Sequence, residues 1–245
     1  MNRFDQAEDP RRRLLIQALS AGLFGAALEQ ANAQGFSIFG SRPAQLPPGQ
    51  SIYGLAGDVA VNDAPAKLST QIRPGDTVQT GRNSEIIFVI GTQSMIMRGD
   101  SRLLVQPAEN TATALVIGGL RLLAGKLLSV SRNSPMKLTT ATATIGIRGT
   151  GFYVEADPAQ TYFCTCYGVT EIEATADPES RETVAATRHD QPLYIVADGG
   201  RGKNIRNAPF INHTDQELAL IETLVGRKTP FVFSKDSYTA PRRTY

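Results

Sequence analysis

The sequence predicts an all-β protein, an antiparallel β-sandwich or jelly roll with one short helix near the C-terminus. Short stretches with alternating apolar residues, roughly twelve of them, recur from residue 52 onward and are separated by turn residues. Twenty-two Gly, 14 Pro and no Trp agree with a chain rich in strands and turns. No helical crossovers separate the strands, which disfavours a parallel βαβ architecture.

Residues 1–33 have the order of a cleavable export signal. Three arginines, Arg11 to Arg13, precede an apolar stretch that ends at Leu28, and Ala31-Asn32-Ala33 follows. The paired arginines resemble a twin-arginine signal. Gln17 and Ser20 interrupt the apolar stretch, so a stable membrane span, which needs about 20 apolar residues, is disfavoured. We expect cleavage near Ala33 and a periplasmic location, with a short uncleaved anchor as the alternative.

The remaining chain is long enough for one domain with an extension. The formal net charge is only +2 and no dense run of Lys and Arg occurs, so the sequence predicts no nucleic-acid partner. Two cysteines cannot build a disulfide-dense scaffold.

The predicted elements follow in order after a Gly, Ser and Pro-rich linker over residues 34–50. Residues 85–90 are nearly all apolar, as in a strand that is buried on both faces. A Leu-rich stretch at 120–128 is typical of either a strand or a short helix, and its neighbours favour a strand. The predicted strands lie at 52–61, 72–78, 85–90, 95–97, 103–105, 115–117, 120–130, 183–187 and 193–196, with a break at Gly125-Lys126.

Residues 138–169 are predicted to form a central pair of strands. The first strand is rich in Thr and Ile, and residues 147–151 bend or interrupt it. Asp157-Pro158-Ala159-Gln160 supplies the connection, and the second strand carries Cys164 and Cys166.

A helix is predicted over residues 213–227. Thr214 and Glu217 form the S/T-x-x-E pattern of a capping box, and apolar residues then recur at helical spacing. Gly226 ends the helix. We expect it to dock on its own domain, and residues 228–245 to form a tail.

Several phrases, taken together, resemble the FecR domain of bacterial envelope signalling proteins. They are G-D-V-A-V at 57–61, I-R-P-G-D-T-V-Q-T-G at 72–81, S-E-I-I-F at 84–88, L-A-G-K-L at 123–127, T-A-T-I-G-I-R-G-T-G-F at 142–152 and Y-G-V-T-E-I at 167–172. The resemblance covers about residues 53–173 and implies an all-β extracytoplasmic domain, which we place at residues 51–175. The late predicted strands form a β extension over 176–212.

Signalling members of that family carry a cytoplasmic anti-sigma segment and a transmembrane helix before this domain. Only ten residues precede the arginines here, so the expectation is a stand-alone exported FecR-like module without the anti-sigma segment. Such a module implies a non-catalytic binding or signalling-accessory role. Its expected partner is an envelope protein, a cell-wall component or a second copy of the chain.

Two residues in the shared phrases are candidate binding residues, Arg148 and Thr150. Arg148 can pair with a carboxylate of its own chain or of a partner. Thr150 fits a strand surface, where its hydroxyl satisfies neighbouring backbone groups. Turn and strand chemistry explain the same residues without a partner.

The chain holds two Cys and two His, and all four lie between residues 164 and 213. Cys164 and Cys166 share one face of the predicted strand, while His189 and His213 lie in polar segments further along. Two thiolates and two imidazoles can bind Zn²⁺ or another transition metal. The spacing is not a standard zinc pattern, so buried thiols with surface histidines, a strained disulfide and an intermolecular contact are alternatives. We therefore expect no required cofactor.

No catalytic motif is present. The sequence lacks G-x-S-x-G, H-E-x-x-H, a Walker sequence and a haem-attachment motif, so we expect no enzyme. Two function classes follow: an envelope binding module, and a periplasmic protein that responds to a metal or to redox state through its Cys and His residues.

Overall fold

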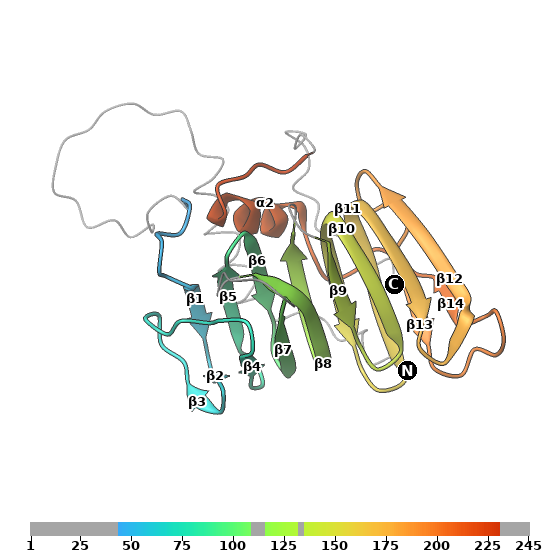
Figure 1. Ribbon diagram of the computed structural model, residues 1–245, viewed down its shortest axis with the longest axis horizontal. Helices are drawn as coiled ribbons and strands as arrows, with labels where there is room; N and C mark the ends of the chain where they lie inside the picture. The colour runs from blue at the N-terminus through green and yellow to red at the C-terminus, as the bar shows by residue number, and fades with distance from the viewer. Residues whose placement is uncertain (1–43, 109–115, 132–134, 231–245) are drawn as a thin grey trace, which may run out of the picture.

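The computed structural model describes residues 44–108, 116–131 and 135–230 (Figure 1). The predicted export signal, most of the linker and most of the tail lie outside the described residues. The strands are β1 (Ile52–Ala56), β2 (Val59–Val61), β3 (Ala64–Pro65), β4 (Thr77–Thr80), β5 (Glu85–Ile90), β6 (Gln93–Met97), β7 (Ser101–Pro107), β8 (Ile117–Val130), β9 (Met136–Thr139), β10 (Ala143–Ala156), β11 (Gln160–Ala174), β12 (Asp177–Ala186), β13 (Leu193–Val196) and β14 (Ile205–Asn207), and the helix is α2 (Asp215–Leu224).

The fold class is all-β with a short C-terminal helix, as predicted. The strands form one 14-stranded sheet whose main path runs β14-β13-β11-β10-β9-β8-β7-β4-β2-β3. The described strand pairs are antiparallel except β8 and β9, which are parallel and make the sheet mixed. Helix α2 packs against β6 and β8 (Figure 1).

The predicted interruption of the central strand is confirmed, and it redirects β10 between two neighbours. Residues 144–147 of β10 pair with β9, whereas residues 151–156 pair with β8. The register against β11 shifts between Arg148 and Gly151, and Gly149 has φ of 63°. Gly168 faces this bulge with φ of 92°, and a Cβ there would lie 2.6 Å from Cγ2 of Thr150. Left-handed backbone and lack of space both require glycine at this position.

Two apolar clusters fill the structure. The larger one draws buried residues from strands along the sheet, from Val61 of β2 to Ile195 of β13, so it extends across most of the sheet. The second lies on the opposite face of β11, under helix α2, and contains both cysteines. Side chains alternate along a strand, which is how β11 contributes to both clusters.

The capping box predicted for the helix is present. Thr214 accepts a hydrogen bond from the backbone N–H of Glu217, whose side chain accepts one from the backbone N–H of Thr214. The helix ends at Leu224, with Gly226 at φ of 69°. No helix in the described part of the chain is long and apolar enough to cross a membrane.

Several strand predictions need correction. The predicted strand at 52–61 is divided into β1 and β2, and only the end of the one predicted at 72–78 lies in a strand, β4. The first strand of the central pair is divided into β9 and β10, and the predicted strands around 117 and at 120–130 are one strand, β8. β8 continues through Gly125 and Lys126 because Gly125 takes φ of 96°, which accommodates the irregularity without ending the strand. The predicted strand at 183–187 is the second half of β12, which begins at Asp177. Asp177 pairs with Ala174 of β11 at the hairpin end where β12 begins.

Candidate metal centre

The four Cys and His residues meet at one place between the sheet and the start of α2. Their potential ligand atoms all lie within 4.8 Å of one another. Cys164 and Cys166 come from β11, His189 from the turn after β12, and His213 from the segment just before the helix. Three separate stretches of chain therefore contribute to one cluster.

The two cysteines point into the second apolar cluster because they are two residues apart on a strand. Both side chains are 0% exposed, and both are free thiols. Sγ of Cys166 lies 3.8 Å from the carbonyl oxygen of Cys164, and Sγ of Cys164 lies 3.6 Å from Nδ1 of His189. The disulfide considered from the sequence is not formed.

His189 is placed by a tight turn. Oδ2 of Asp190 accepts hydrogen bonds from the backbone N–H of Thr187 at 2.6 Å and of Arg188 at 3.2 Å. The backbone N–H of His189 donates to the carbonyl of Cys166 at 3.0 Å, and its φ is 52°. A non-glycine residue held in the left-handed region carries conformational strain, and such strain clusters at functional sites.

His213 is placed by a second left-handed residue and by aromatic neighbours. Asn212, immediately before it, has φ of 58°. The His213 ring stacks on Tyr153 with 4.5 Å between centroids, and Phe210 lies against both histidine rings at 4.4 and 4.6 Å. His213 is 1% exposed, so its ring is removed from solvent.

The outer hydrogen bonds of the two rings determine which nitrogens carry protons. Nδ1 of His213 lies 2.7 Å from the carbonyl oxygen of Ile211, which can only accept, so this nitrogen is the donor. Nε2 of His189 lies 2.9 Å from Oδ1 of Asp215, a carboxylate oxygen, so it too is the donor. Each ring therefore directs its other nitrogen, Nε2 of His213 and Nδ1 of His189, toward the centre.

These two inner nitrogens are 3.1 Å apart. Two lone pairs facing each other at that distance repel unless a cation, either a proton or a metal ion, lies between them. A tetrahedral Zn²⁺ site separates two nitrogens by about 3.3 Å, nitrogen and sulfur by about 3.6 Å and two sulfurs by about 3.8 Å. The observed nitrogen–nitrogen and nitrogen–sulfur distances of 3.1 and 3.6 Å are close to these values.

The residues of the cluster shift one another's pKa values. Burial alone would raise the pKa of Cys164, but Cys166, His213 and His189 outweigh burial and hold that pKa well below its usual range. Burial raises the pKa of Cys166, and the adjacent Cys164 raises it further. Burial opposes protonation of His189, yet Asp215 and Cys164 outweigh it and raise the pKa of His189 to about 9. When no metal ion is bound, these shifts in pKa favour a thiolate at Cys164 and a proton on the inner nitrogen of His189.

The successive contacts from Cys164 to His189 and from His189 to Asp215 also match a catalytic arrangement of a nucleophile, a base and an orienting carboxylate. A nucleophile must reach its substrate, whereas Cys164 is 0% exposed and packed among Tyr153, Tyr162 and the helix. Complete burial is typical of a thiolate that serves as a metal ligand in a closed site, so the geometry favours binding over catalysis.

Residues that the sequence did not single out support the cluster. Asp215 orients His189 and also accepts a hydrogen bond from Arg188 at 2.5 Å. Arg98, which directly follows β6, pairs with Glu217 of the helix at 2.5 Å, and both side chains are 3% exposed. In the sequence, Asp215 was recognisable only as an acidic residue in the first turn of the predicted helix. Acidic residues are common there because they stabilise the helix N-terminus, so this position did not indicate a contact with His189.

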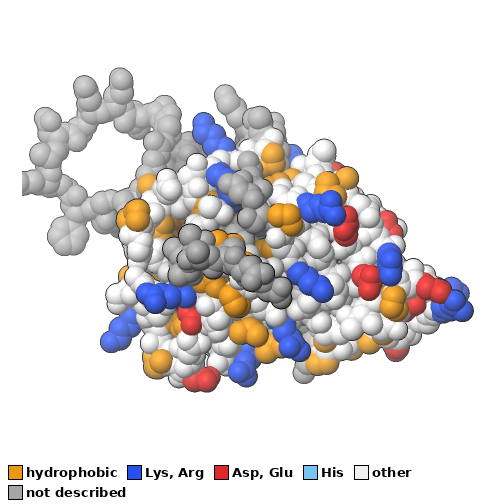
Figure 2. All heavy atoms as spheres, in the orientation of Figure 1, with side chains coloured by type: hydrophobic (Ala, Val, Ile, Leu, Met, Phe, Trp, Pro, Cys, Tyr) orange, Lys and Arg blue, Asp and Glu red, His pale blue; other side chains and the backbone are white. Residues whose placement is uncertain are grey.

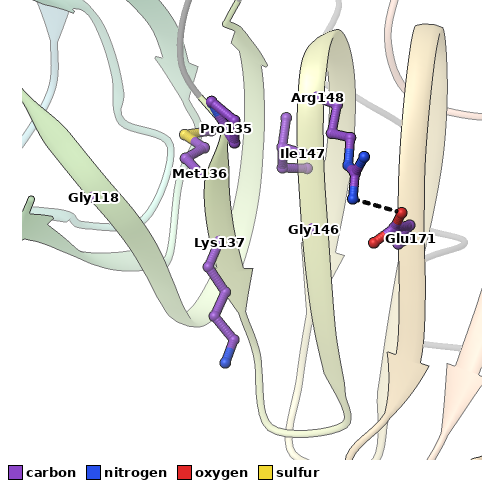
Figure 3. Close-up of a pocket in the computed structure, with 8 residues that line it drawn as sticks. All are labelled: Gly118, Pro135, Met136, Lys137, Gly146, Ile147, Arg148 and Glu171. Carbon is purple, nitrogen blue, oxygen red and sulfur yellow. Dashed lines mark ion pairs between the residues drawn. The ribbon is translucent and has the colours of Figure 1, made fainter.

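The other two predicted binding residues lie elsewhere. Arg148 is exposed on β10 and pairs with Glu171 of its own chain at 2.9 Å, beside an open pocket of about 330 Å³ (Figure 3). Thr150 is 0% exposed, and its hydroxyl has no hydrogen-bond partner in the described structure. Thr150 thus packs in the interior, while Arg148 stays available at the surface.

Figure 2 shows Lys and Arg side chains scattered over the face drawn there, with Asp and Glu among them.

Comparisons with known proteins give little beyond this geometry. No protein-family model matches the chain, and no curated protein sequence matches it. It is similar to two crystal structures of a candidate anti-sigma factor from Parabacteroides distasonis ATCC 8503, with TM-scores of 0.42 and 0.41 and 11% sequence identity. Each match covers 54% of this chain and 58% of the other, so it spans less than two thirds of those structures.

Proposed function

We propose that this protein binds one transition-metal ion, with Zn²⁺ the first candidate, through Cys164, Cys166, His189 and His213. The observation that carries the proposal is the approach of the two inner imidazole nitrogens to 3.1 Å, with each outer nitrogen held by an acceptor. A proton between the rings relieves the repulsion of one pair of atoms. A metal ion satisfies both nitrogens and both sulfurs together.

The donor set determines the class of metal. Two thiolates and two imidazoles suit Zn²⁺ and other ions that accept soft ligands, whereas Mg²⁺ and Ca²⁺ prefer oxygen ligands. All four positions of a tetrahedral ion would be filled by the protein, which is the composition of a structural or sensing site rather than a catalytic one. Phe210 and Tyr153 wall off the histidine rings, and a dry surrounding strengthens the ligand bonds.

The cellular role that we propose for this site is metal-responsive accessory function in the bacterial envelope. The support is the export-type sequence of residues 1–33 and the FecR-like phrases, of which the longest, at 142–152, occupies the bent strand β10. The partner class that we propose is an envelope protein, a cell-wall component or a second copy. A non-metal binding role of the same module is the second candidate, and exposed Arg148 beside its pocket favours it.

Metal analysis of untagged protein tests the metal proposal. We expect one Zn²⁺ per chain by elemental analysis after dialysis against Zn²⁺, and thiolate-to-metal absorption when Co²⁺ replaces it. Cys166→Ser removes one sulfur at nearly constant volume and is expected to abolish stoichiometric binding. Thr165→Ser is the matched control, because Thr165 is buried on the opposite face of the same strand. Substoichiometric metal in the parent protein, with the same stability in Cys166→Ser, would refute the proposal.

A further inference from the structure

The candidate metal centre shares residues with the beginning of helix α2. His213 directly precedes Thr214, the N-cap residue, and His189 donates from Nε2 to Asp215, the first residue of the helix. Asp215 also accepts from Arg188, next to His189 in the turn. The carboxylate of Asp215 therefore connects the turn that carries His189 to the helix that begins just after His213.

The rest of the helix depends on docking to the sheet. Its buried apolar side chains pack in the second cluster, and Glu222 and Glu217 accept hydrogen bonds from Tyr167 and Arg98. With ten residues, α2 is shorter than the roughly 12–15 residues at which an isolated helix is even marginal in water. If the helix leaves the sheet, it therefore unfolds, and undocking and unfolding are one event. The apolar helix residues concerned are Leu218, Leu220, Ile221 and Leu224.

We propose that Asp215 is a positioning residue that couples metal binding to docking of helix α2, so that the metal ion holds the helix over the apolar face of the sheet. The inference rests on the proposed metal-binding function. The two sulfurs and His189 belong to the sheet and its β12–β13 connection, whereas His213 belongs to the segment that leads into the helix. Bonds from one ion to both groups tie the two parts together, and Asp215 transmits this tie to the first helical turn.

Thermodynamic linkage gives the proposal its consequence. A ligand that binds only the docked state stabilises that state, and removal of the ion returns the helix to its own marginal stability. Loss of the ion then increases exposure of the face that α2 covers, which includes Ile96 and Leu128. Metal occupancy of the site thereby controls whether the apolar face of the sheet under helix α2 is covered.

Hydrogen exchange of the full chain, followed by mass spectrometry with Zn²⁺ and after chelation, tests the coupling. We expect Zn²⁺ to slow exchange of residues 215–226 by tenfold or more, while residues 117–130 of β8 change little. Asp215→Ala is expected to keep one Zn²⁺ per chain but to bind it about 10–100-fold more weakly, the usual effect of losing an outer-shell partner. It should also lose most of the zinc-dependent protection of the helix.

Two further variants separate positioning from simple structural loss. Asp215→Asn keeps an oxygen that can accept from Nε2 of His189, so it should recover most of the protection. Thr223→Ala, which alters only a hydrogen bond to Ala219 inside the helix, should behave like the parent. One bound Zn²⁺ with unchanged helix exchange would overturn the coupling alone, and parent-like behaviour of Asp215→Ala would overturn the role of Asp215. Absence of Zn²⁺ binding would overturn the proposed function itself.

Discussion

Nε2 of His213 lies 3.1 Å from Nδ1 of His189, and the opposite nitrogen of each ring is held by an oxygen acceptor. The two acceptors belong to different groups, the backbone carbonyl of Ile211 and the side chain of Asp215. Both rings are thus oriented before any ion binds, which lowers the ordering cost of binding.

Removing one inner nitrogen should remove the metal. His213→Ala is expected to lower Zn²⁺ from one per chain to a small fraction, because three remaining donors in a closed site leave the ion incompletely ligated. Elemental analysis and competition with a coloured chelator measure the change. Since this variant also loses the stacking on Tyr153, His213→Phe is the companion that restores an aromatic ring without a ligand. Full occupancy in both variants would contradict the assignment of His213.

Zinc affinity should rise with pH between pH 6.5 and about 9. His189 has its pKa raised from the ordinary value of 6.5 to about 9, so between these values the folded, metal-free chain holds a proton that Zn²⁺ must displace. Affinity should increase about tenfold per pH unit for each displaced proton. Chelator competition at several pH values measures this slope. A flat profile between pH 6.5 and 9 would show that His189 is not a ligand.

The stability of the metal-free protein should fall as the pH rises, because it depends on protonated His189. A raised pKa means that protonated His189 stabilises the fold, fully below pH 6.5 and progressively less as the pH rises through about 9. Chelated protein should therefore lose this contribution over that window, and Zn²⁺ should reduce the loss. Urea unfolding at each pH, with and without Zn²⁺, measures both curves. His189→Gln is the control, because its glutamine does not titrate.

Breaking the buried ion pair on the helix should be costly. Arg98→Met removes the guanidinium that contacts the buried carboxylate of Glu217, and the loss of an ion-pair partner at such a site costs about 3–5 kcal/mol. The double variant Arg98→Met with Glu217→Gln also removes the buried negative charge and keeps a capping-box side chain, so it should recover part of the loss. Urea unfolding gives the free energies, and equal stability of the single and double variants would contradict the explanation.

The continuity of β8 should depend on Gly125. Gly125 has φ of 96°, and a Cβ there would lie 2.0 Å from Oγ and 2.4 Å from Cα of Ser101. Gly125→Ala should destabilise the fold by more than the roughly 1–2 kcal/mol that left-handed backbone alone costs an L-residue. Gly75→Ala is the matched control, since Gly75 has φ of 101° with no atom within 4 Å of its added Cβ. Equal losses in the two variants would show that the contact with Ser101 is not decisive.

The fold was largely predictable because its signals are local. Period-two alternation, turn residues and the interruption at 147–151 placed most strands, and Thr214 with Glu217 placed the helix start. Gly125 was misjudged as a break because glycine in a strand sequence indicates either an end or an irregularity, and only the facing Ser101 distinguishes them. The family assignment and the export signal stay predictions.

The candidate site was predictable only in part. By itself the sequence determined that Cys164 and Cys166 share a strand face and that His213 stands at a helix start, because both follow from local repeats. Only the tertiary structure decided that His189 meets them and that Asp215 and Arg98 support them. Those contacts span 24 to 119 residues of chain and depend on strand pairing, a left-handed turn and helix docking, none of which leaves a periodic signal in the sequence.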